Sequence, residues 1–199
     1  MKVKICGLKT KEAVDTAVNN GADFIGFVFA KSKRRIAPEL VREITTDVPL
    51  DVKKVGVFVS PTLDEVELTV KAAGLDMIQI HGEQLIETPS VPCISAVSVN
   101  KGNHRFLETA KVAEYVLFDA PPKQYAGGNG ETFDWETLDL KPLEDKKVFI
   151  AGGLTVENVQ KAKKVFDPYA VDVSSGVETN GEKDLEKIKQ FLQRAKEEI

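Results

Sequence analysis

The chain has few cysteines, no excess of basic residues and no long apolar run. Cys6 and Cys93 are the two cysteines among 199 residues, and their spacing fits neither a metal site nor a disulfide framework. A formal net charge of −4 gives no field that attracts nucleic acid or an anionic membrane. No apolar run approaches the roughly 18 residues that cross a bilayer, and no signal-peptide pattern begins the chain. We therefore expect a cytoplasmic protein with reduced thiols and neither nucleic-acid nor membrane partners.

The composition is that of an ordinary globular domain. Apolar residues make up 42% of the chain and charged residues 29%. A chain of 199 residues is long enough for one well-buried core and short for two. No linker, low-complexity segment or shift in composition divides the sequence. We expect residues 1–199 to form a single domain.

Short apolar runs rich in β-branched residues recur along the whole sequence. They lack strict alternation, which is typical of strands covered on both faces in a parallel sheet. The expected strands are Val3–Gly7, Phe24–Phe29, Lys54–Val59, Met77–Ile80, Ile94–Val99, Tyr115–Phe118, Lys147–Ile150 and Tyr169–Val173.

Helical patterns separate most of these runs. The expected helices are Lys11–Asn20, Pro38–Thr46, Thr62–Ala73, His104–Ala113, Val156–Phe166 and Asp184–Ile199. Thr155 is the expected N-cap of the fifth helix, and Ser60 or Thr62 that of the third. The connections Gly82–Pro92 and Ala120–Lys146 hold the weakest helical signals, so short or irregular helices are expected there. Eight strand–helix units of about 25 residues predict a compact (β/α)8 barrel.

Polar and glycine residues follow almost every expected strand. The carboxyl ends of barrel strands meet on one face, where such barrels carry their sites. The glycine loops after strands six to eight contain Gly127-Gly128-Asn129-Gly130, Ala151-Gly152-Gly153 and Ser174-Ser175-Gly176. Glycine lets backbone N–H groups converge on an anion, although it also simply makes tight turns. Three such loops on one rim favour a phosphate site.

The titratable residues at the strand ends each admit two interpretations. Cys6 is either an inert buried residue or a general base with a lowered pKa, whereas Cys93, at the opposite rim, is interpreted as structural. Asp119 is either used in chemistry or holds its loop. Asp172 faces either the barrel mouth or the helix layer, and His81 contacts either a ligand or its own loop.

The basic run 31–35 is the remaining candidate. Such runs are usually solvated loops, but at the rim of an acidic protein this one could bind an anionic substrate, with arginine as the better carboxylate ligand.

The sequence resembles the phosphoribosylanthranilate isomerase family over nearly its whole length. The motifs that carry the resemblance are Lys4-Ile5-Cys6-Gly7-Leu8, Gly21-Ala22-Asp23-Phe24-Ile25-Gly26-Phe27-Val28-Phe29, Ser32-Lys33-Arg34, Val55-Gly56-Val57-Phe58-Val59, Gln79-Ile80-His81-Gly82-Glu83, Gly127-Gly128-Asn129-Gly130, Thr132-Phe133-Asp134-Trp135, Ala151-Gly152-Gly153-Leu154 and Val171-Asp172-Val173-Ser174-Ser175-Gly176-Val177-Glu178. Nine motifs in the right order make the resemblance specific. The sequence departs from the family at Glu131, where relatives often have lysine.

The resemblance implies an enzyme of tryptophan biosynthesis that performs an Amadori rearrangement of a phosphorylated aminoaldose. Asp119 would be the general acid, Cys6 the general base, and Arg34 the ligand of the anthranilate carboxylate. The substrate would also be bound by His81, Asp172, Gly128, Gly130, Gly152, Gly153, Ser175 and Gly176. The resemblance implies no metal or other cofactor, and the protein would act as a monomer or homodimer.

Two alternatives remain open at this point. One is another phosphosugar barrel enzyme, such as the related histidine-pathway isomerase or an epimerase. The histidine-pathway relative typically has an aspartate at the end of its first strand, where this chain has Cys6. The other alternative is a barrel that binds a phosphorylated ligand without catalysis.

Overall fold

The structure is a computed structural model that describes residues 1–98, 113–119, 143 and 145–197. Eight parallel strands close into a barrel in which each strand pairs with its neighbours along the chain and the first pairs with the last. The strands are β1 (Lys2–Cys6), β2 (Phe24–Val28), β3 (Lys53–Val59), β4 (Met77–His81), β5 (Cys93–Ser98), β6 (Tyr115–Asp119), β7 (Lys147–Ala151) and β8 (Ala170–Val173). The predicted (β/α)8 barrel is confirmed.

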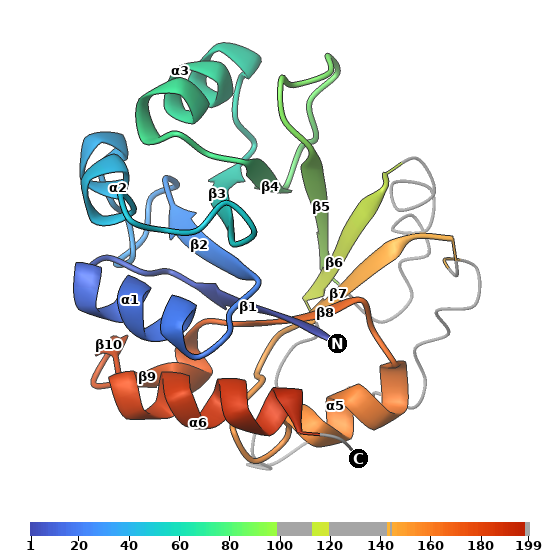
Figure 1. Cartoon of the computed structure of the whole chain (residues 1–199). Helices are drawn as coiled ribbons and strands as arrows, with labels where there is room; N and C mark the ends of the chain where they lie inside the picture. The colour runs from blue at the N-terminus through green and yellow to red at the C-terminus, as the bar shows by residue number, and fades with distance from the viewer. Residues whose placement is uncertain (99–112, 120–142, 144, 198–199) are drawn as a thin grey trace, which may run out of the picture.

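The described helices lie outside the ring of strands and cover part of its circumference (Figure 1). They are α1 (Lys11–Asn19), α2 (Pro38–Ile44), α3 (Leu63–Ala73), α5 (Val159–Phe166) and α6 (Leu185–Lys196). Of the two N-cap residues predicted for α3, Ser60 and Thr62, the structure has Thr62, which forms a capping box with Glu65. No helix in the described ranges is long and apolar enough to cross a membrane.

Two connections differ from expectation. Residues 82–92 form no helix, where a short or irregular one was expected from the weak helical signal. The predicted start of the fifth helix is wrong, since α5 begins at Val159 and Asn158 is its N-cap. The side chain of Asn158 instead accepts a hydrogen bond from the N–H of Thr155 (2.8 Å) and donates one to the carbonyl of Gly153 (2.9 Å), so residues 155–158 form a turn. The predicted helix His104–Ala113 and the connection after β6 lie almost wholly outside the described residues.

A short hairpin that the sequence analysis did not anticipate follows β8. The 3-10 turn η3 (Ser175–Val177) leads into β9 (Glu178–Thr179), which pairs antiparallel with β10 (Glu182–Lys183) before α6 begins. The hairpin lies outside the barrel beside α6 (Figure 1).

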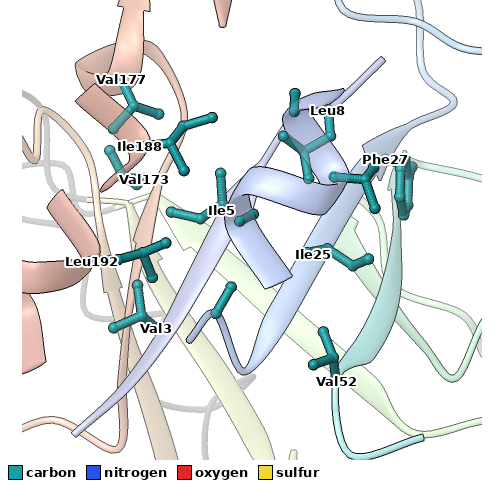
Figure 2. Packing of buried hydrophobic residues seen from close by; sticks show 14 of the residues in the cluster. Val3, Ile5, Leu8, Ile25, Phe27, Val52, Val173, Val177, Ile188 and Leu192 are labelled. Carbon is teal, nitrogen blue, oxygen red and sulfur yellow. The ribbon is translucent and has the colours of Figure 1, made fainter. Parts of the chain in front are cut away.

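One face of each strand packs against the helices. In β1 these residues are Val3 and Ile5, both fully buried, which lie close to Ile188 and Leu192 of α6 (Figure 2). Because side chains alternate along a strand, Lys4 and Cys6 then point into the barrel. The apolar outer layer thus fixes which residues of each strand reach the interior.

The barrel interior changes character along its axis. From the amino ends towards the middle of the strands it is filled by an apolar cluster that includes Phe24, Val55, Met77, Ile94, Phe149 and Ala170. The next inward positions towards the carboxyl ends mix apolar residues with the buried polar residues Lys4, Gln79 and Asp172. The floor is therefore a packed core, and the layer above it, which holds these polar residues, opens into the site.

Candidate active site

A cavity of about 1250 Å³ opens at the carboxyl ends of the strands. It brings together most of the predicted site residues, namely Cys6, Arg34, His81, Asp119, Gly152, Gly153, Asp172, Ser175 and Gly176. Gly128 and Gly130, and with them Glu131, lie outside the described residues. The cavity is also lined by Gln79, which was not among the predicted site residues.

Cys6 lies at the end of β1, and its thiol is buried. Burial raises the pKa of this thiol, while the charge of Lys4 opposes the rise without cancelling it. The lowered pKa that was attached to the general-base interpretation of Cys6 is not found, because desolvation of the thiolate outweighs the neighbouring cation. Gly26 of β2 pairs with Cys6, and a Cβ at Gly26 would come within 2.8 Å of the sulfur. The glycine leaves the space that the thiol occupies.

Asp119 ends β6, on another side of the same cavity. Burial raises the pKa of its carboxyl group, and the charge of His81 opposes that rise. A raised pKa is the direction that suits a general acid. A carboxyl group in this position holds a proton to higher pH than a solvated aspartate does.

His81 ends β4 and lies within 2.8 Å of the amide nitrogen of Gln79, measured to the histidine Nε2. Burial lowers the pKa of His81, although the charge of Asp119 opposes this, so the ring stays neutral over a wider pH range. The amide oxygen of Gln79, Oε1, is buried and has no hydrogen-bond partner within the described part of the chain. Gln79 shares an inward face with His81, two residues later, which is the signal that could have identified it.

Asp172 points into the barrel interior, where Lys4 lies on the neighbouring strand. The distance from Lys4 Nζ to Asp172 Oδ1 is 3.1 Å, and the side chains are 0% and 8% exposed. Asp172 therefore faces the mouth, and it forms an ion pair as well as lining the cavity. Lys4 was not among the predicted residues, although it lies two positions before Cys6 on the same face of β1.

The loops after β7 and β8 meet on one wall of the cavity. Gly152 and Gly153 adopt φ angles of +86° and +63°, in the region that favours glycine. A Cβ on Gly176 would lie 1.8 Å from the carbonyl oxygen of Leu154, so only glycine allows the loops to approach so closely. One wall of the cavity is thus formed by Gly152, Gly153, Ser175 and Gly176.

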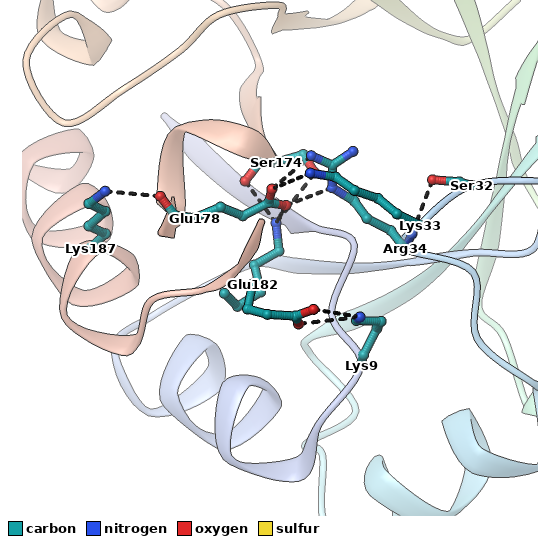
Figure 3. A network of polar contacts seen from close by, with 9 residues as sticks. Lys9, Ser32, Lys33, Arg34, Ser174, Glu178, Glu182 and Lys187 are labelled. Carbon is teal, nitrogen blue, oxygen red and sulfur yellow. Dashed lines mark hydrogen bonds and ion pairs between the residues drawn. The ribbon is translucent and has the colours of Figure 1, made fainter. Parts of the chain in front are cut away.

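Arg34 is the partly buried member of its basic run, and it also lines the cavity. Its Nε and Nη2 atoms donate to the two carboxylate oxygens of Glu178, at 2.6 and 2.8 Å (Figure 3). Lys183 donates to the same carboxylate at 2.9 Å. Burial alone would raise the pKa of Glu178, but the hydrogen bonds from Arg34 and Lys183 lower it to about 2. The carboxylate therefore stays charged and fixes the guanidinium in place.

Glu178 and Lys183 were missed because both belong to the unexpected β9–β10 hairpin. The chemistry of the cavity is then a thiol, a carboxyl group of raised pKa, a neutral imidazole and an oriented guanidinium beside a glycine wall. Within the described ranges, no cluster of three or more His, Cys, Asp or Glu side chains could hold a metal ion.

Comparison with known proteins agrees with this arrangement. Residues 3–194 match the family described as N-(5'-phosphoribosyl)anthranilate (PRA) isomerase. The chain is 54% identical to N-(5'-phosphoribosyl)anthranilate isomerase of Streptococcus mutans, over 98% of each chain, and 49% identical to that of Listeria monocytogenes, over 98% of each.

Solved structures give the same result. Phosphoribosyl anthranilate isomerase from Thermotoga maritima matches with a TM-score of 0.83 and 39% identity, covering 98% of each chain. A phosphoribosyl anthranilate isomerase structure in complex with reduced 1-(o-carboxyphenylamino)-1-deoxyribulose 5-phosphate matches with a TM-score of 0.81 and 37% identity, again covering 98% of each chain. The chain belongs to the N-(5'-phosphoribosyl)anthranilate isomerase family.

Proposed function

We propose that this chain isomerises N-(5-phosphoribosyl)anthranilate to 1-(2-carboxyphenylamino)-1-deoxyribulose 5-phosphate, with Asp119 as general acid and Cys6 as general base. The observation that carries the proposal is that a carboxyl group of raised pKa and a buried thiol end different strands of one barrel and line the same cavity. The related structure that holds the reduced product supports the choice of substrate.

In the first step, Asp119 donates its proton to the ribose ring oxygen as the C1–O bond breaks. The nitrogen lone pair of the substrate forms the C1=N bond of a protonated Schiff base, and Asp119 is left as a carboxylate. A proton donor is needed here because an alkoxide would otherwise be expelled into a poorly solvated cavity. The raised pKa of Asp119 suits this role.

In the second step, the Cys6 thiolate removes the C2 proton, the C2–H electrons form a C1=C2 double bond, and the C1=N π electrons return to the nitrogen. The resulting enolamine tautomerises to the ketone by losing the proton of its C2 hydroxyl and gaining one at C1. The Schiff base itself accepts the electrons, so the proposed mechanism uses no cofactor. The task of the protein is to hold acid and base on the correct atoms.

The two pKa shifts determine the protonation state that reacts. Burial raises the pKa of both groups, so each holds its proton to higher pH than a solvated counterpart. The reactive form, with a thiolate and a carboxylic acid, binds the same number of protons as the form with a thiol and a carboxylate. Its fraction is therefore independent of pH between the two pKa values.

The remaining residues are proposed to bind the substrate. Arg34, oriented by Glu178, would bind the anthranilate carboxylate, because an arginine fork fits a planar anion. The wall of Gly152, Gly153, Ser175 and Gly176 would bind the phosphate, joined by Gly128 and Gly130 beyond the described residues. His81 and Asp172 would contact the sugar from the cavity wall.

The direct test mixes purified protein with phosphoribosylanthranilate and follows the fluorescence of that compound, which should fall as it is converted. Cys93 starts β5 at the opposite end of the barrel, so Cys93→Ala should convert the substrate and Cys6→Ala should not. Absence of turnover by the unmodified chain over a range of pH would refute the assignment. Binding of substrate without turnover would favour the non-catalytic alternative.

We further propose that residues 1–199 act as one domain in the cytoplasm, as a monomer or homodimer, on this phosphorylated small molecule and without nucleic-acid or membrane partners. A related structure is described as a monomeric form of a dimeric isomerase from Thermotoga maritima. Sedimentation of the purified protein measures which of the two states it adopts.

A further inference from the structure

Lys4 holds a charge in the barrel interior for which the proposed reaction has no assigned use. Its side chain is fully buried, and its ammonium group is 3.1 Å from the Asp172 carboxylate. Lys4 and Cys6 lie on the same face of β1. A Cβ at Gly26 would lie 3.1 Å from Lys4 Nζ and 2.8 Å from Cys6 Sγ, so both atoms border the space that this glycine leaves open.

A buried ion pair is a poor way to stabilise a barrel. Removing two charges from water costs free energy that their attraction only partly returns, and apolar residues of similar volume often do as well or better. The layer just below is built from such residues, including Phe24 and Phe149. A charged pair directly above an apolar core, and beside the thiol, therefore calls for a role in the chemistry.

We propose that Lys4 is a positioning residue for Cys6: its ammonium group, held in place by Asp172, stabilises the thiolate that removes the C2 proton. That the thiolate removes the C2 proton rests on the proposed function. That Lys4 stabilises the thiolate can be tested on Cys6 alone. The proposal also assigns Asp172 a second task, because its side chain accepts the hydrogen bond that orients the Lys4 ammonium group.

The charges around Cys6 agree with this role. Burial alone would lower the pKa of Lys4, but Asp172 raises it above its ordinary value, so the ammonium form persists. Lys4 is the strongest influence that favours the Cys6 thiolate, and Asp172 disfavours it. Lys183 of β10 favours the thiolate more weakly.

Three further titratable groups share the cavity. Arg34, in the loop after β2, interacts with the Cys6 charge. His81 and Asp119 line the cavity at the ends of β4 and β6. Removing Lys4 should therefore leave the cost of burying the Cys6 thiolate unchanged, while only weaker charges, such as that of Lys183, still favour the thiolate.

The test measures the thiol directly by its rate of alkylation with iodoacetamide as a function of pH. All variants carry Cys93→Ala, so that Cys6 is the only thiol in the chain. Lys4→Met should raise the pKa of Cys6 further, and alkylation at pH 7 should become about tenfold slower or more. Lys2→Met removes a cation from the other end of the same strand, beside Phe24 and Tyr169, and should leave the rate unchanged within about twofold.

Asp172→Asn distinguishes this role from a structural one. The amide introduced at position 172 can still accept a hydrogen bond from Lys4, and the thiolate also favours the ammonium form, so Lys4 should keep its place and charge at pH 7. Loss of the carboxylate then removes a charge that opposes the thiolate, and alkylation at pH 7 should become faster, opposite to the effect of Lys4→Met. If the pair served only the structure, both variants would break the same contact and change the rate in the same direction.

The double variant Lys4→Met/Asp172→Asn covers the case in which Lys4→Met does not fold, because it leaves no unpaired charge. Its Cys6 should alkylate more slowly than in the Cys93→Ala parent, since the influence of Lys4 exceeds that of Asp172. A rate within twofold of the parent in the folded Lys4 variants, or slower alkylation in Asp172→Asn, would overturn the proposal. These measurements need no substrate, so failure of the isomerase assignment would appear separately, as an absence of turnover.

Discussion

The two ends of the barrel interior are built by the same strands and do opposite things. At the amino ends, Phe149 packs against Phe24, Tyr115 and Tyr169, with ring centroids 5.2 to 6.5 Å apart. At the carboxyl ends, the corresponding inward positions hold Cys6 and groups such as His81 and Asp119 around a cavity. The contrast shows how a barrel separates stability from chemistry. At one end, burial of apolar side chains stabilises the fold, and at the other, burial shifts the pKa values of titratable side chains.

The largest effect is expected from the two proton-transferring residues. Cys6→Ala and Asp119→Asn should each lower kcat by about 10²–10⁴-fold with little change in KM, because each removes one proton transfer. Steady-state kinetics with phosphoribosylanthranilate measures both constants, and thermal unfolding checks that the variants fold. Near-full activity of Asp119→Asn would contradict its assignment as the general acid.

At the other end of the barrel, Phe149→Ala should act on stability alone. Phe149 is fully buried, so its truncation should lower the free energy of unfolding by about 3–5 kcal/mol. Denaturant unfolding measures the loss, and KM of the folded protein should not change. Leu50→Ala, at a side chain that is 92% exposed, is the control and should stay within about 0.5 kcal/mol. A changed KM in Phe149→Ala would mean that the two ends are coupled.

Arg34→Ala should mainly weaken substrate binding. Loss of a charged hydrogen-bonding partner typically costs about 1.5–3 kcal/mol, so KM should rise roughly 10–100-fold. Lys33→Ala, at the exposed neighbour in the same loop, should raise KM far less. A loss confined to kcat in Arg34→Ala would argue against carboxylate binding.

The pH dependence of kcat/KM should show the smallest of these effects between the two pKa values. Below the raised pKa of Asp119, which exceeds 3.8, a second proton converts the thiolate to a thiol, and above the raised pKa of Cys6, which exceeds 9.0, the acid is lost. The profile of kcat/KM should therefore have a plateau and fall on both the acid and the alkaline side. In Asp119→Asn the residual activity should instead rise with pH as the thiolate forms. An alkaline fall that persists in Asp119→Asn would contradict the assignment of Asp119 as the acid.

The strand pattern and the strand-end rule were sufficient to predict the barrel and to place Cys6, His81 and Asp119 on one rim. Each of these follows an apolar run directly, so its position depends only on local sequence. The roles of acid and base came from the family resemblance. The start of α5 was misplaced because the side chain of Asn158 bonds to the backbone of Gly153 and Thr155, a contact that competes with helix and has no signal in hydrophobic periodicity.

The partners of these residues could not be predicted in the same way. Glu178 is 144 residues from Arg34, and Asp172 is 168 residues from Lys4, so neither pair has a local signature. Lys4 follows Val3 in a strand, and a lysine there looks like a solvent-facing residue until the closed barrel puts it inside. The raised pKa of Cys6 likewise has no local signature in the sequence, because the depth at which the thiol is buried is a property of the assembled barrel.

The pairing of β1 with β8 also has a consequence for the order in which the chain is made. Cys6 and Lys4 leave the ribosome first, and Asp172 follows roughly 10 to 30 s later at ordinary rates of synthesis. Until then β1 lacks one of its two neighbours, and the ion pair between Lys4 and Asp172 cannot form. The charged groups beside the thiol are therefore brought together only after most of the chain has been made, so a chain cut short before β8 would leave Lys4 without its carboxylate partner.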